Sequence, residues 1–197
     1  MKLWKPVVSV LAISAVATLP LMAQPAGSTP APAAAKPAPK RASPGEVTST
    51  VIDGNRVTLV YSRPGVNDPK TGQARKIWGG LVPYGSVWRA GANEASMLIT
   101  QQPIEIGGTA VPAGAYTLFM LPVENGPSKL ILNKQLGQWG SQYDEKQDLA
   151  RIDLKQSAPA SPVEQFTMSV AKESTGGGTL TLVWDTQQFT VPYTVKK

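Results

Sequence analysis

The chain has 197 residues, a hydrophobic content of 42% and a formal net charge of +6, values typical of one globular domain with short appendages. The excess charge is confined to the start of the chain, because the residues from Glu46 onward include fourteen Lys or Arg against thirteen Asp or Glu, and this balance excludes a nucleic-acid binder. The absence of cysteine and histidine excludes disulfides, thiolate metal sites, a cysteine nucleophile and a Ser-His-Asp triad, and we expect neither a metal ion nor a cofactor.

Residues 1–23 have the three-part layout of a secretory signal peptide. Lys2 and Lys5 precede an apolar run over 7–19, and small residues lead to a cleavage site after Ala23. An uncleaved membrane anchor is the alternative, although the apolar run is shorter than the ~20 residues that span a bilayer. Both interpretations predict an exported domain, periplasmic or secreted. With a cleaved signal peptide, the chain meets the membrane only transiently, during export.

Residues 24–45 predict a disordered linker. The segment is rich in alanine and contains six prolines, and it has almost nothing that a core would bury. This composition favours an extended, solvated tether of ~3.1 Å per residue.

Residues 46–197 predict a single all-β domain. Alternating runs at 46–52 and 55–62 flank Asp53-Gly54, which is typical of a β-hairpin. We expect an antiparallel β-sandwich or jelly-roll-like barrel of about nine to eleven short strands, with long irregular loops and at most one short helix, near 143–148. The further strands are expected at 97–100, 104–106, near 111, and at 116–121, 129–132, 149–155, 164–171, 180–184 and 189–195.

The stretch 63–96 is too long and too aromatic for a simple connector, because loops beyond ~12 to 15 residues are usually functional or disordered. Aromatic rings, a guanidinium, an amide and a carboxylate occur together in it, and the irregular segment 133–148 offers similar groups. Such groups bind sugars or peptides by covering apolar faces and fixing polar ones. The candidate ligand-binding residues are Trp78, Tyr84, Trp88, Arg89, Asn93, Glu94, Trp139 and Tyr143.

A structural role for the same residues is the alternative. The loop would fold over an open end of the core, and each buried aromatic side chain would contribute about 1.5 to 3 kcal/mol. In this interpretation Arg89 and Glu94 form a partly buried ion pair, and Asn93 satisfies backbone groups at a turn. A purely structural envelope module would have no pocket.

Catalysis has one candidate constellation, because glycoside hydrolysis needs two facing carboxylates. Glu94 with Asp144 or Glu145 is the pair that the sequence nominates. We interpret the acidic run 144–148 as a solvated helix start rather than a calcium loop, since Lys146 interrupts it.

Several motifs together resemble the bacterial domain of unknown function DUF 2911. They are the string RKIWGGLVPYGSVWRAGANEAS at 75–96, Pro112–Phe119, Ile131–Lys134, Trp139-Gly140 and Leu182–Asp185. The resemblance extends over about 46–195 and implies an exported bacterial domain without assigned catalytic residues. Combined with the residues above, it favours a non-catalytic binding or interaction module. Its partner is unknown, and the candidate classes are a glycan or another cell-envelope component. The alternative function is a periplasmic, glycan-directed, carboxylate-dependent hydrolase.

Overall fold

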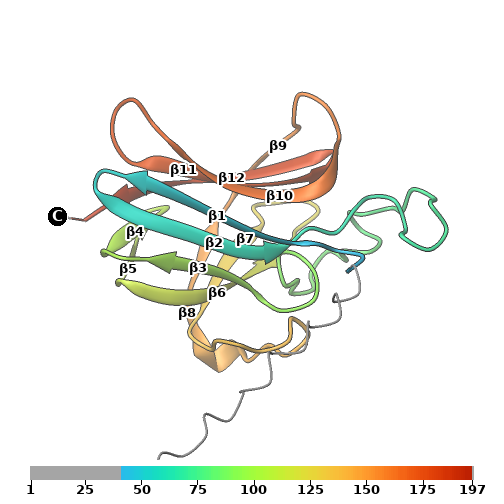
Figure 1. The fold of residues 1–197 in the computed structure, drawn as a ribbon, viewed down its shortest axis with the longest axis horizontal. Helices are drawn as coiled ribbons and strands as arrows, with labels where there is room; N and C mark the ends of the chain where they lie inside the picture. The colour runs from blue at the N-terminus through green and yellow to red at the C-terminus, as the bar shows by residue number, and fades with distance from the viewer. Residues whose placement is uncertain (1–40, 197) are drawn as a thin grey trace, which may run out of the picture. The chain divides into compact units, whose positions relative to one another are not determined.

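The computed structural model describes residues 41–196, which form two antiparallel β-sheets packed face to face (Figure 1). The predicted β-sandwich is therefore confirmed, and among the described strands the sheets stay open instead of closing into a jelly-roll-like barrel. The predicted signal peptide, 1–23, and residues 24–40 of the predicted linker lie outside the described residues. No helix within 41–196 has the length and apolarity that crossing a membrane requires.

The first sheet has six strands in the order β1-β2-β3-β6-β7-β8. They are β1 (Gly45–Ile52), β2 (Asn55–Ser62), β3 (Ser96–Thr100), β6 (Gly114–Leu121), β7 (Lys129–Asn133) and β8 (Asp148–Asp153). The second sheet has the order β10-β11-β12-β4-β5, and a short strand β9 pairs with β12 beside this path. Its strands are β4 (Ile104–Ile106), β5 (Thr109–Val111), β9 (Lys155–Ser157), β10 (Val163–Lys172), β11 (Gly178–Asp185) and β12 (Gln187–Val195).

The predicted hairpin is confirmed as β1 and β2. Asp53 and Gly54 connect them with φ values of 49° and 82°, so both central residues are left-handed, as in a type I′ turn. The register places Ile52 opposite Asn55. The predicted helical turn is also present, as the 3-10 helix η1 (Glu145–Gln147), which the Asp144 side chain caps by accepting a hydrogen bond from the Lys146 N–H.

The sequence pattern predicts one strand over 149–155, and the structure corrects this. β8 ends at Asp153 in the first sheet, and β9 begins at Lys155 in the second, so the described residues contain twelve strands instead of nine to eleven. Leu154 lies between them, buried, and its N–H donates to the Ser128 carbonyl over 2.9 Å. The alternation of exposed and buried residues continues through Leu154, so the sequence carries no signal of the crossover.

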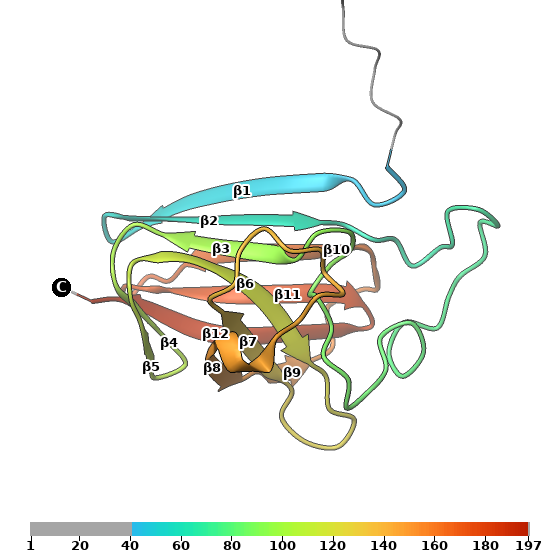
Figure 2. The same ribbon diagram turned by 90° about the horizontal axis from the view of Figure 1, so that it is seen from below.

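The core between the sheets contains side chains from both layers, among them Leu59, Leu118, Phe166, Leu182 and Val191. At one end the long segment between β2 and β3 extends beyond the strands and turns back toward them (Figure 2). Several of its side chains belong to the same core, so the segment is part of the folded body.

Buried Asn55 connects β2 to the turn after β3. Its amide donates to the Thr100 hydroxyl (2.8 Å), and its carbonyl accepts the N–H groups of Gln101 and Gln102 (3.1 and 3.0 Å). We predict that Asn55→Ala lowers the free energy of unfolding by about 2 kcal/mol, because these groups lose their partner. Urea denaturation measures the change.

The matched control is Asn67→Ala, since Asn67 is exposed and its side chain makes no hydrogen bond among the described residues. This variant should change the free energy by less than about 0.5 kcal/mol. Equal effects of the two substitutions would contradict the structural role assigned to Asn55.

Candidate functional site

An aromatic cluster anchors the long segment to the end of the sandwich. Trp78 is only 7% exposed, and its indole N–H donates to the Trp184 carbonyl over 3.1 Å. Trp88 stacks on Trp184 with ring centroids 5.7 Å apart and an interplanar angle of 17°, and it meets Phe166 edge-on at 5.1 Å. The rings therefore fix the segment between β2 and β3 in one position.

A tight turn follows Trp88 and brings its polar residues close to β2. Ala90 and Asn93 have φ values of 46° and 60°, and the Ser96 hydroxyl donates to the Ala90 carbonyl over 2.7 Å. At Gly91, with φ 150°, a Cβ atom would lie 2.9 Å from the Ser62 carbonyl oxygen. The close approach to β2 thus requires glycine at this position.

Asn93 connects four parts of the chain. Its amide nitrogen donates to the Ser43 carbonyl (3.1 Å) and to the Ser62 hydroxyl (3.2 Å). The backbone carbonyl of Asn93 accepts hydrogen bonds from the Gly140 N–H and from the Arg89 guanidinium, both at 3.0 Å. The segment before β1, the end of β2, the loop and the segment after β7 therefore meet at one residue.

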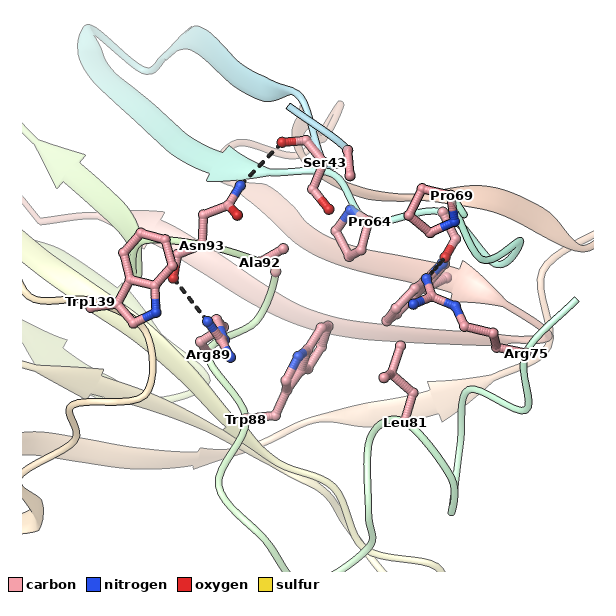
Figure 3. A pocket seen from close by; sticks show the side chains of 14 residues that line it. Ser43, Pro64, Pro69, Arg75, Leu81, Trp88, Arg89, Ala92, Asn93 and Trp139 are labelled. Carbon is pink, nitrogen blue, oxygen red and sulfur yellow. Dashed lines mark hydrogen bonds between the residues drawn. The ribbon is translucent and has the colours of Figure 1, made fainter. Parts of the chain in front are cut away.

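A cavity of about 290 Å³ lies at this meeting point (Figure 3). Its apolar lining consists of Pro64, Pro69, Leu81, Trp88, Trp139 and Trp184, and its polar lining consists of Ser43, Arg75, Arg89 and Asn93. Four small residues complete the wall: Ala42, Gly65, Gly91 and Ala92. The cavity thus combines aromatic surface with two guanidinium groups and an amide, and none of its lining residues is acidic.

The two arginines are held by backbone carbonyls. Arg89 donates one N–H to the Asn93 carbonyl, and its aliphatic stem passes directly over Gly140. Arg75 donates to the carbonyl groups of Gly65 and Val66. Each guanidinium has five N–H donors, so these bonds position both groups and leave donors for a ligand.

Four of the eight predicted ligand-binding residues line this cavity together: Trp88, Arg89, Asn93 and Trp139. The other four lie elsewhere. Trp78 is in the core, and Tyr84 packs against the core and accepts a hydrogen bond from the Gln187 amide over 3.2 Å. Glu94 faces a second cavity, and Tyr143 lies in a polar network beside β8.

The expected ion pair between Arg89 and Glu94 is wrong. Both Glu94 oxygens accept from Arg41 at 2.8 Å, and this pair is exposed to solvent. A hydrogen bond from its own backbone N–H and the contact with Arg41 hold the pKa of the Glu94 carboxyl below its ordinary value. Arg41 belongs to the predicted linker 24–45. Arg41 pairs with Glu94, Ser43 accepts from Asn93 and Gly45 begins β1, so the end of the predicted linker is part of the folded domain.

A second cavity of about 370 Å³ adjoins the outer face of β1–β3. It contains Val47, Val60 and Met97 together with two carboxylates, Glu46 and Glu94. Glu46 lies 3.7 Å from the Arg63 guanidinium, so both carboxylates of this cavity have arginine partners.

Tyr143 packs on Phe119 and donates a 2.6 Å hydrogen bond to Asp148, which also accepts from Arg151 and Asn133. The Tyr143 ring thereby packs against a small apolar cluster that contains Phe119 of β6 and Ile131 of β7. Burial and the bond to Asp148 raise the pKa of Tyr143 to about 12.

Sequence reasoning missed Arg75, Leu81 and Trp184 as lining residues. Arg75 and Leu81 lie in the stretch 63–96 but outside the group of aromatic and planar polar residues that drew attention to 84–94. Trp184 lies in the strand expected at 180–184, and a regular strand gives no indication of a ligand site. Among residues 41–196, no three acidic side chains are close enough to hold a metal ion.

A family model described as "Protein of unknown function (DUF2911)" matches residues 43–193. This match agrees with the resemblance found in the sequence motifs over about 46–195. The comparisons with curated proteins and with solved structures give no match.

We predict that Gly140→Ala disturbs the cavity. The added Cβ would lie 2.3 Å from Arg89 Cδ and 2.8 Å from the Asn93 carbonyl oxygen. Relieving this overlap should lower the free energy of unfolding by about 1 to 3 kcal/mol, which urea denaturation measures. Gly45→Ala is the control, because a Cβ at Gly45 meets nothing within 4 Å. An unchanged free energy of unfolding in Gly140→Ala would contradict the contact between Arg89 and Gly140.

We predict that alkaline pH destabilises the domain through Tyr143. The folded state favours the neutral phenol, so the stabilisation is complete below the ordinary tyrosine pKa of 10.0 and is lost as the pH rises through about 12. Denaturation curves at increasing pH should show a smaller loss of stability in Tyr143→Phe than in the unmodified chain. Parallel pH profiles for the two proteins would refute the prediction.

Proposed function

We propose that this chain, which belongs to the DUF2911 family over residues 43–193, is a non-catalytic binding module that holds a small ligand in the cavity between Trp139 and Arg89. The observation that carries the proposal is an exposed aromatic ring beside fixed polar donors. Trp139 is 48% exposed although it lines a cavity, so a ligand can cover its ring. Burying that apolar surface would favour association.

The geometry of the polar groups supports recognition of a defined ligand. Arg89 is oriented by the Asn93 carbonyl, and Asn93 is itself held by Ser43 and Ser62. Groups that are already fixed lose little conformational entropy when a ligand binds. Rings that cover apolar faces and polar groups that fix hydroxyls or amides suit a sugar or a short peptide.

The size of the cavity limits what it can hold. Its volume of about 290 Å³ is just below the roughly 300 to 1,000 Å³ found for ligand pockets. We infer that it accepts one small molecule, or one terminal unit of a longer glycan or peptide.

Binding is better supported than hydrolysis. A glycosidase needs a carboxyl group that stays protonated, and none of the residues that line the cavity is acidic. Glu94, the predicted catalytic carboxylate, lies in the neighbouring cavity with Arg41, and its lowered pKa suits an ion-pair partner better than a proton donor.

The proposed setting is the periplasm or the cell exterior. Its support is the signal-peptide layout of residues 1–23, and a glycan or another cell-envelope component is the partner that this setting would supply. Fractionation of cells that express the full chain tests the location, and a cytoplasmic product would contradict it.

We predict that Trp139→Ala weakens ligand binding about tenfold, since the exposed ring contributes about 1.4 kcal/mol when a ligand covers it. A panel of glycans and cell-wall peptides is screened by tryptophan fluorescence, and isothermal titration calorimetry gives the affinities. The stability of this variant should stay within about 0.5 kcal/mol of the unmodified chain, because the ring is half exposed.

Leu136→Ala is the matched control. Leu136 is 49% exposed, precedes Trp139 by three residues and lines neither cavity. Its replacement should leave the affinity unchanged. If no ligand in the panel binds, or if both variants bind as tightly as the unmodified chain, the proposed site is wrong.

A further inference from the structure

The arginines of the described chain fall into two groups by their partners. Within residues 41–196, Arg41, Arg63 and Arg151 each have a carboxylate within 4.0 Å. Arg56, Arg75 and Arg89 have none in this part of the chain. Arg56 is exposed, whereas Arg75 and Arg89 are partly buried and line the same cavity.

The carboxylates beside the cavity walls are already engaged. Glu94 is paired with Arg41, and Glu164, which lies beside Gly65, accepts the Asn67 N–H over 3.0 Å. Asp68 precedes Pro69, accepts the Lys70 and Thr71 N–H groups and interacts with the charge of Arg75 without forming an ion pair. None of these carboxylates lines the cavity, so Arg89 is the guanidinium most available to an anion.

The two guanidinium groups lie on opposite sides of the cavity. Figure 3 shows Arg89 near Trp139 and Arg75 beyond Trp88 and Leu81. A partly buried cation gains most from an anion, because hydrogen bonds between charged partners are about twice as strong as neutral ones. Apolar walls strengthen this attraction further, since they lower the local dielectric.

We propose that the ligand of this cavity carries a carboxylate that binds Arg89 while its apolar body lies against Trp139 and Trp88. This inference rests on the proposed binding function and names the ligand's chemical class. A planar guanidinium with several unused N–H donors matches the two oxygens of a carboxylate in one plane. Arg75, held by carbonyl groups across the cavity, adds positive potential that favours anionic ligands over neutral ones.

The test compares ligands that differ only in the acidic group. N-acetylmuramic acid is paired with the amide of its lactyl carboxyl group, and acetyl-alanyl-alanine is paired with its C-terminal amide. Calorimetric titration of the full chain at low salt should show that at least one acid binds about tenfold or more tightly than its neutral partner. The preference should shrink as the salt concentration rises, because added ions screen the attraction.

Arg89→Gln should remove this preference, because the affinity for the acid should fall about tenfold further than the affinity for its neutral partner. The matched control is Arg56→Gln, because Arg56 also lacks a carboxylate partner among the described residues but lines neither cavity. Thermal melting verifies that each variant folds. If Arg89→Gln does not fold, the salt titration of the unmodified chain tests the same charge dependence without a substitution.

The outcomes separate this inference from the proposed function. Equal affinity for acid and neutral ligands overturns the carboxylate assignment and leaves the binding function standing. A preference that is insensitive to salt, or that survives in folded Arg89→Gln, also overturns it. Tighter binding of N-acetylglucosamine 6-phosphate than of either acid would replace the carboxylate by a phosphate. Failure of every ligand to bind removes the binding function and this inference together.

Discussion

The packing of Trp78 and Trp88 against Trp184 is the contact on which the rest of the structure depends. The long segment between β2 and β3 has little regular structure, and burying its aromatic rings in the core offsets the conformational entropy lost when it is ordered. Lengthening a loop adds only slowly to the cost of closing it, so the size of the segment is no obstacle. Arg75, Arg89 and Leu81 belong to the same segment, so the walls of the cavity exist only while those rings stay buried.

The site combines a rigid side with an exposed side. Asn93 and Gly140 hold the polar side, where side-chain and backbone hydrogen bonds fix the position of Arg89. Trp139 forms the exposed side on a different segment, joined to the loop through a single β-bridge to Glu94. A scaffold that fixes the donors while leaving one ring available suits recognition of a ligand better than chemistry on it.

The fold could be predicted largely from local patterns, because alternation and turn residues such as Asp53-Gly54 act over short distances. The crossover at Leu154 could not be predicted, because the alternation of exposed and buried residues continues without a break although β8 and β9 belong to different sheets. The sequence also located the segment that supplies much of the cavity wall. It could not distinguish buried Trp78 from half-exposed Trp139, because two tryptophans differ only in the residues that pack on them. The partner of Glu94 was missed for a similar reason: Arg41 lies 53 residues away, whereas Arg89 is near in sequence.

The contact between Asn93 and Ser43 sets a limit on how the protein can be shortened for experiments. Ala42 and Ser43 contribute to the cavity wall although they precede the first strand. A recombinant form starting at Gly45 would retain every described strand and still open one side of the pocket. Expression clones and affinity tags therefore need to leave the residues from Arg41 onward in place, and a domain boundary drawn at β1 would yield a well-folded protein with a damaged site.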